Sequence, residues 1–198
     1  MTQLSTAKNN DRPKHEPHEE GTFAAVCVDN WSLSKPNPYK GQANRFDTSK
    51  IDNRDTLTSV CIGFLTSETI EIDGVVKPRY TSFWAPFSWH EKSKLRQAIA
   101  KWMPAFAMND AVNLDDLIGK PCMVTVKQYD KRDGSKGHGV DSIVPLPKGM
   151  EAMVPKIPAD FERHKDREAR KAAEAGGDSH QAPMPTGSTI ADVDGLPF

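Results

Sequence analysis

The sequence predicts a mainly β fold: a five-stranded barrel with a helical insertion between the third and fourth strands. Three observations predict it. Apolar and β-branched runs recur between polar turns, one segment of helical period interrupts them, and both ends of the chain lack apolar density. A length of 198 residues and a hydrophobic fraction of 37% fit one ordinary domain with unpacked ends. We therefore expect the domain at residues 21–149.

Residues 1–20 form a charged leader with two prolines and only scattered apolar side chains. Such a segment buries too little apolar surface to offset the entropy lost on ordering, so we expect it to be disordered. His15 and His18 lie beside three glutamates and could bind a metal ion weakly. We favour a solvated polar tail and predict no metal site.

The first strand is expected at Phe23–Leu33, which has the apolar density of a strand with buried faces. Pro36, Pro38 and Gly41 then open a polar stretch that runs to about Asp55 and cannot form a regular element. Structureless loops longer than about 12–15 residues are uncommon in compact domains and are often functional. This long loop is therefore a candidate for contacting a ligand.

The second and third strands are expected at Thr56–Ser67 and Lys77–Phe87, with an Asp-Gly step between them that is typical of a tight antiparallel hairpin. Leu95, Ile99 and Trp102 then recur with the period of a helix that has one buried face. Pro104 should end this helix. Its start is open between a capping box of Ser88 and Glu91 and the alternative caps Ser93 and His90.

The fourth strand is expected at Pro121–Tyr129, after a short helix at Asn113–Gly119. This strand alternates cleanly, because Cys122, Val124 and Val126 share one face while polar side chains occupy the other. The glycine-rich basic turn Asp130–Gly139 and a short closing strand at Val140–Leu146 complete the domain.

Beyond residue 149 the packing signal fails. Residues 150–190 comprise Ala159–Ala175, which can form a charged helix without a broad apolar stripe, and a linker rich in glycine and proline. Residues 21–149 hold 17 basic and 14 acidic side chains, a net charge of +3, whereas residues 150–198 hold 6 and 9, a net charge of -3. A mildly basic domain is thus followed by an acidic arm.

Several classes of protein are disfavoured by the sequence. No apolar run approaches the roughly 20 residues that span a bilayer, and no secretory signal is present, so we expect a cytoplasmic protein that binds no membrane. The well-separated Cys27, Cys61 and Cys122 are expected as buried free thiols. No phosphate-binding loop or acidic cluster with a nucleophile occurs, so we expect no enzyme, catalytic residue or cofactor.

Five antiparallel strands with a helix between the third and fourth is the order of an OB-fold, a partly open barrel whose face and loops bind oligonucleotides. Cations alternate with aromatic rings on its expected binding face. These candidate residues are Lys35, Tyr39, Lys40 and Arg45 on the first loop, Lys77, Arg79, Tyr80 and Trp84 on the third strand, and Lys127, Tyr129, Lys131, Arg132 and Lys136 on the fourth strand and its turn.

Such a combination suits single-stranded nucleic acid, because cations neutralise phosphates and bases stack on rings. For Trp84, a place in the core is an equally good interpretation, and strand parity puts Trp31 with the buried Phe23 and Cys27. Tyr129 and Lys127 are the better candidates because they share the polar face of the strand with the clearest alternation. Basic turns are also common on surfaces for solubility alone.

The segment Asp192–Phe198 predicts a protein-docking tip within residues 191–198. Two aspartates, Asp192 and Asp194, precede three residues with apolar side chains, Leu196, Pro197 and Phe198. An apolar ring together with a terminal carboxylate can enter a small basic-rimmed pocket of another protein. The tip resembles that of bacterial single-stranded DNA-binding proteins, except that Val193 and Gly195 stand where those tips usually carry aspartate.

Residues 21–149 also resemble phage and prophage single-stranded DNA-binding proteins with an OB-fold. The segments that carry the resemblance are Glu20-Gly-Thr, Ser88 with Glu91-Lys-Ser-Lys-Leu, Leu117 to Val126, and Pro145-Leu-Pro-Lys-Gly. It implies a protein that coats single-stranded DNA during phage replication, recombination or repair and recruits replication or recombination proteins through its tip. A protein-binding adaptor and a strand-annealing recombinase are the alternatives, and each is compatible with a homo-oligomer.

Overall fold

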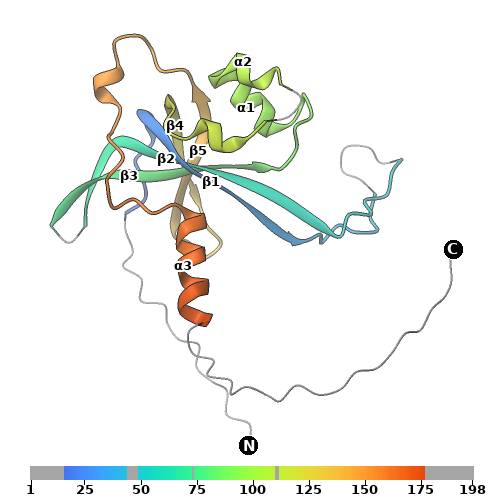
Figure 1. Ribbon diagram of the computed structural model, residues 1–198. Helices are drawn as coiled ribbons and strands as arrows, with labels where there is room; N and C mark the ends of the chain where they lie inside the picture. Colours follow the sequence, from blue (N-terminus) through green and yellow to red (C-terminus); the bar gives the residue numbers. More distant parts are fainter. Residues whose placement is uncertain (1–15, 44–48, 73, 110–111, 177–198) are drawn as a thin grey trace, which may run out of the picture. The chain divides into compact units, whose positions relative to one another are not determined.

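The fold is built from one five-stranded antiparallel sheet that curls into a half-barrel (Figure 1). The structure is a computed structural model that describes residues 16–43, 49–72, 74–109 and 112–176. The spatial order of the strands is β3-β2-β1-β4-β5. In chain order they are β1 (Gly21–Pro36), β2 (Thr56–Ile72), β3 (Val75–Pro86), β4 (Pro121–Asp130) and β5 (Lys136–Val144). The mainly β prediction is confirmed.

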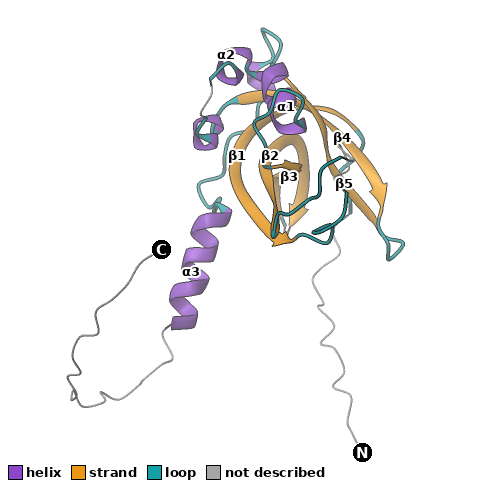
Figure 2. Ribbon diagram, turned by 90° about the vertical axis from the view of Figure 1, so that its right-hand side faces the viewer, coloured by secondary structure: helices purple, strands orange, loops and turns teal. Residues whose placement is uncertain are grey.

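Irregular pairing bends the strands, and the two edges of the sheet approach each other (Figure 2). The register of β1 against β2 shifts between Cys27 and Asp29. The register of β2 against β3 shifts between Thr66 and Thr69. Such bulges bend a strand and increase its twist. A Cβ atom placed on Gly139 of β5 would lie 3.6 Å from the carbonyl oxygen of Ser82 in β3. This close approach forms a seam between β3 and β5.

The inner face of the half-barrel carries the main core. Cys122, Val124 and Val126 are fully buried there, which confirms the alternation predicted for β4. The three cysteines are buried free thiols, as expected. Burial raises the pKa of Cys27 to about 12, so this thiol stays protonated at neutral pH.

Three short helical elements follow β3: α1 (Lys94–Trp102), α2 (Pro104–Ala107) and the 3-10 turn η1 (Leu114–Leu117). Ser93 caps α1, because its hydroxyl accepts a hydrogen bond from the backbone N–H of Arg96 at 3.2 Å. Pro104 ends α1 and also begins α2, since proline is tolerated in the first turn of a helix. α1 packs its three buried side chains into the main core: Leu95, Ile99 and Trp102.

Residues 16–20 pack against the strands, so the expectation of a disordered leader is wrong for this part of it. The side chain of His18 is 0% exposed, and its Nε2 lies 2.8 Å from the Thr66 hydroxyl. Its backbone N–H donates to Nδ1 of His138 at 3.2 Å, and its carbonyl accepts from Gln128 at 3.0 Å. These partners lie on β2, β5 and β4, so the composition of the leader alone could not reveal them.

A buried ion pair between Arg79 and Glu68 adjoins His18. Arg79 is 9% exposed, and its guanidinium donates to the Glu68 carboxylate at 2.6 Å. The same carboxylate contacts the imidazole of His18. Burial lowers the pKa of His18, while the carbonyl of Glu19 and the charge of Glu68 oppose this shift. Removing one member of such a buried ion pair lowers the stability of the fold, because the remaining charge stays buried without a partner.

Residues 154–164, here called the C-terminal strap, pack on the outer face of the sheet, opposite the main core. Two of its side chains, Val154 and Phe161, contact an apolar cluster of Val26, Val28 and Leu65. The domain therefore extends past the boundary expected at residue 149. The expectation is wrong because these apolar side chains are isolated among prolines and charges and show no period.

Helix α3 (His164–Gly176) lies almost wholly in the second of two units, Met1–His164 and Lys165–Phe198. Arg170 pairs with Glu174 at 3.0 Å and Lys171 with Glu168 at 2.8 Å along its surface. Such pairs support a solvated helix. Within the ranges described above, no helix is long and apolar enough to cross a membrane.

Candidate nucleic-acid interface

Two tryptophans meet on the outer face of the sheet. Trp31 of β1 and Trp84 of β3 both pair with Cys61 of β2, so all three lie in one row. The two indole rings contact edge to face, with centroids 5.7 Å apart and an interplanar angle of 89°. The side chain of Trp84 is 40% exposed. Its neighbour Phe83 fills the core instead, because successive side chains of a strand alternate between faces.

Polar contacts hold Trp84 in position. Its indole N–H donates to the hydroxyl of Ser82 at 3.2 Å, and its backbone carbonyl accepts from the Lys94 ammonium at 3.1 Å. The same ammonium lies 4.8 Å from the centre of the Phe83 ring. Lys94 thus contacts the backbone of Trp84 and the ring of Phe83, whose side chain lies on the opposite face from the Trp84 ring. A fixed, exposed ring such as that of Trp84 is suited to stack a base.

Tyr129 continues this surface on β4. Its ring lies over β5, since a Cβ atom placed on Gly137 would come within 2.7 Å of it and one on Gly139 within 3.8 Å. Gly139 in turn adjoins Ser82 across the seam, at 3.6 Å from its carbonyl oxygen. The outer surface is therefore continuous from Trp84 through the seam to Tyr129, which is 55% exposed. We call the surface formed by Trp31, Trp84 and Tyr129 the aromatic row.

The turn after β4 adds cations at one end of the aromatic row. Lys131, Arg132 and Lys136 are exposed, as predicted for this turn. Asp133 closes the turn, because its carboxylate accepts from the backbone N–H of Ser135 at 3.0 Å and from its hydroxyl at 2.6 Å. These hydrogen bonds hold the pKa of Asp133 below its usual value, so the turn also carries a negative charge.

The long loop after β1 is an extension of the β1–β2 hairpin. Lys35 is exposed at the end of β1 and Tyr39 is exposed on the loop, whereas Lys40 pairs with Asp55. Arg45 lies outside the described residues. Arg54 holds the pKa of Asp52 well below its usual range through an ion pair at 2.6 Å. Of the cations expected here, Lys40 is thus already paired with a carboxylate.

Three residues expected on the binding face of β3 are engaged elsewhere. Lys77 pairs with Asp160 of the strap at 2.7 Å, and Arg79 is the buried partner of Glu68 described above. Tyr80 packs in the apolar cluster under the strap, where its ring would come within 2.8 Å of a Cβ atom on Gly63. Arg79 is engaged by Glu68 and the carbonyl of Glu16, and Tyr80 packs with the strap, so both are structural residues.

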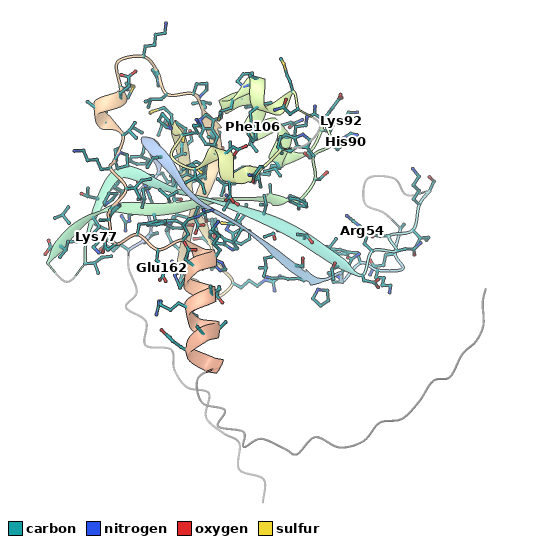
Figure 3. All side chains as sticks on the ribbon, in the orientation of Figure 1. Arg54, Lys77, His90, Lys92, Phe106 and Glu162 are labelled. Carbon is teal, nitrogen blue, oxygen red and sulfur yellow. The ribbon has the colours of Figure 1, made fainter. Side chains whose placement is uncertain are left out.

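The candidate residues are not gathered at one point. Figure 3 places Lys77 and Arg54 at opposite ends of the sheet. Lys127, on the same face as Tyr129, pairs with Asp141 at 2.9 Å. Trp84, Tyr129 and the turn cations form the compact part of the predicted set. One residue that sequence reasoning did not place there is Trp31, which contacts Trp84.

The protein-docking tip and its residues Asp192, Asp194, Leu196, Pro197 and Phe198 lie outside the described residues. Among the residues that are described, no group of three or more His, Cys, Asp or Glu side chains could hold a metal ion. A comparison with protein-family models finds no match for this chain, and no curated protein is significantly similar to it.

Proposed function

We propose that this protein binds single-stranded DNA without sequence preference along the aromatic row. The observation that carries the proposal is the row itself. The indole of Trp84 is held by Ser82, and the surface continues to Tyr129 and the basic turn. Rings accept any base by stacking, which is worth about 1–3 kcal/mol per base, and cations contact the backbone.

The strand connectivity supports an OB-type barrel for this activity. β1 pairs with both β2 and β4, β3 and β5 form the two edges, and these edges approach at the seam. The helical elements follow β3 and precede β4 in the chain. In OB-folds, oligonucleotides bind across the face and the loops after the first and fourth strands, and fold alone carries function only by analogy.

The setting that we propose is the replication, recombination or repair of a phage or prophage genome. It rests on the sequence resemblance of residues 21–149 and on the tip, Leu196-Pro197-Phe198, which would recruit replication or recombination proteins. The linker before the tip is rich in glycine and proline, a composition that gives a docking tip reach.

A protein-binding adaptor is the second candidate, and the ion pairs favour it. Lys40, Lys77 and Lys127 each contact a carboxylate, and Arg79 is buried. Paired cations contribute less to phosphate binding, because the DNA must compete with the carboxylate. Binding of nucleic acid separates the two candidates.

The test is a titration of labelled oligo-dT at two salt concentrations, read by fluorescence anisotropy. We expect binding that weakens steeply with salt, and Trp84→Ala should weaken it by about 5- to 150-fold, the equivalent of one lost stack. Phe87→Ala is the matched control. Phe87 is a 62% exposed aromatic residue that directly follows the end of β3. Absence of binding by the folded protein, or equal affinities of the two variants, would refute the proposal.

A further inference from the structure

One face of the Trp31 indole is covered by the chain itself. The imidazole of His164 stacks on it with ring centroids 4.6 Å apart and an interplanar angle of 4°. Near-parallel rings at this spacing are also how a nucleobase stacks on an aromatic side chain. Trp31 is the edge-to-face partner of Trp84, so the covered indole belongs to the surface proposed to bind DNA.

His164 is held there by a buried carboxylate of β1. Its backbone N–H donates to Oδ2 of Asp29 at 2.7 Å, and Asp29 is 2% exposed. The guanidinium of the preceding Arg163 lies between two carboxylates, at 3.6 Å from Asp29 and 2.5 Å from Asp115. The end of the strap is therefore fixed by charge as well as by stacking.

The rest of the strap follows the same outer face. Phe161 and Val154 pack against the apolar cluster around Leu65, and Asp160 pairs with Lys77. The ion pair of Arg163 with Asp115 lies at the surface, because the side chain of Asp115 is 46% exposed. Residues 163–164 can therefore open while Phe161 stays packed. Release of these two residues would uncover the Trp31 face without unfolding the domain.

We propose that the covered face of Trp31 is a nucleobase-stacking site, and that His164 occupies it until single-stranded DNA displaces residues 163–164. This inference rests on the proposed function. Apparent affinity is reduced by the fraction of molecules whose binding-competent state is closed. A variant that keeps the strap end released should therefore bind DNA more tightly than the natural sequence.

The decisive variants are His164→Ala, which removes the stack, and Arg163→Gln, which removes the anchor. We expect each to bind oligo-dT about three- to tenfold more tightly, the factor that corresponds to one aromatic or charged contact. For Arg163→Gln, the direction of the change in DNA affinity distinguishes two explanations. Loss of a cation weakens DNA binding by simple electrostatics, whereas release of the strap strengthens it.

Two controls match these variants. Arg170→Gln removes a cation from an exposed ion pair in α3, and His90→Ala removes an exposed imidazole elsewhere. Neither should tighten binding. The proposal is supported if His164→Ala and Arg163→Gln bind oligo-dT more tightly and the two control variants do not. Equal or weaker binding by both, in a protein that does bind DNA, overturns it and leaves the proposed function standing. If no protein of the series binds DNA, both fail.

A measurement on the unaltered protein avoids any effect of substitution on folding. The backbone N–H of His164 is hydrogen-bonded to a buried carboxylate, so its hydrogen exchange should be slow in the free protein. Saturating oligo-dT should accelerate exchange in the peptide that contains residues 162–164. Unchanged or slower exchange at saturation contradicts displacement of the strap.

Discussion

His138 is held in its neutral form by its surroundings. Its Nδ1 accepts the backbone N–H of His18, which requires this nitrogen to carry no proton. Burial lowers the pKa of His138, and a hydrogen bond to the backbone of Tyr80 opposes the shift only in part. Protonation would thus break the contact that holds residues 16–20 on the half-barrel.

We expect the free energy of unfolding to fall as the pH drops below about 6.5. In the unfolded chain His138 titrates near that value, whereas in the folded protein its pKa is lower, so the unfolded state binds more protons in this window. Stability is therefore fully present above pH 6.5 and is lost as the pH falls. Burial of His18 contributes with the same sign.

Urea unfolding at pH 7.5 and 5.5 measures this loss. His138→Asn should reduce it, because the amide oxygen can accept the same N–H without titrating. His90→Asn, at an exposed position, should leave it unchanged. An equal loss in His138→Asn and the natural protein would show that His138 is not the group responsible.

Single residues also show where sequence reasoning succeeds and where it fails. The alternation of Cys122, Val124 and Val126 is regular, so their burial could be predicted. Trp31 could not be placed in the same way. The bulge between Cys27 and Asp29 changes the parity of β1, and Trp31 faces outward although counting from Cys27 puts it inside. The bulge depends on how β1 pairs with β2, and the sequence of β1 by itself does not predict this pairing.

Among elements, the strands were the most predictable, because each is a dense apolar run between turn formers. Their ends differ from expectation where polar residues continue the pairing. β2 extends to Ile72, and β5 begins at Lys136 inside the expected turn. The second short helix is a 3-10 turn at Leu114–Leu117. The strap was missed because two apolar side chains in a charged segment give no periodic signal.

The strap should be required for full stability. A chain that ends at residue 149 loses Val154 and Phe161 and exposes the cluster of Val26, Val28 and Leu65. We expect it to unfold at a lower denaturant concentration, by about 2–4 kcal/mol for two lost apolar contacts. A chain that ends at residue 164 is the control and should match the full-length protein. Equal stability of both truncations would show that the strap contributes no packing energy.

At the scale of the whole molecule, the two signs of net charge are divided between two parts of the sequence. The net charge of +3 on residues 21–149 is modest, and several of its cations are paired within the half-barrel. Residues 150–198 carry a net charge of -3. Binding of DNA and recruitment of partners should therefore be separable by deletion.

Deletion of residues 191–198 tests this separation. We expect affinity for oligo-dT to be unchanged or higher, because two aspartates are removed, while binding to bacterial replication and repair enzymes that recognise such tips is lost. Surface plasmon resonance with purified enzymes measures the second effect. Phe198→Ala should reproduce it, and Ile190→Ala, just before the tip, should not. Loss of DNA binding with partners unaffected would contradict the proposal.

The central place of β1 sets the order in which this chain can fold. β1 pairs on one side with the adjacent hairpin strand β2, but on the other its Gly21–Val26 segment pairs with Pro121–Val126, far along the chain. Closing so long a loop is slow, so we expect the β1–β2–β3 meander to form while one edge of β1 is still unpaired. Residues 16–20 contact β2, β4 and β5, so we expect them to dock only after these strands have paired.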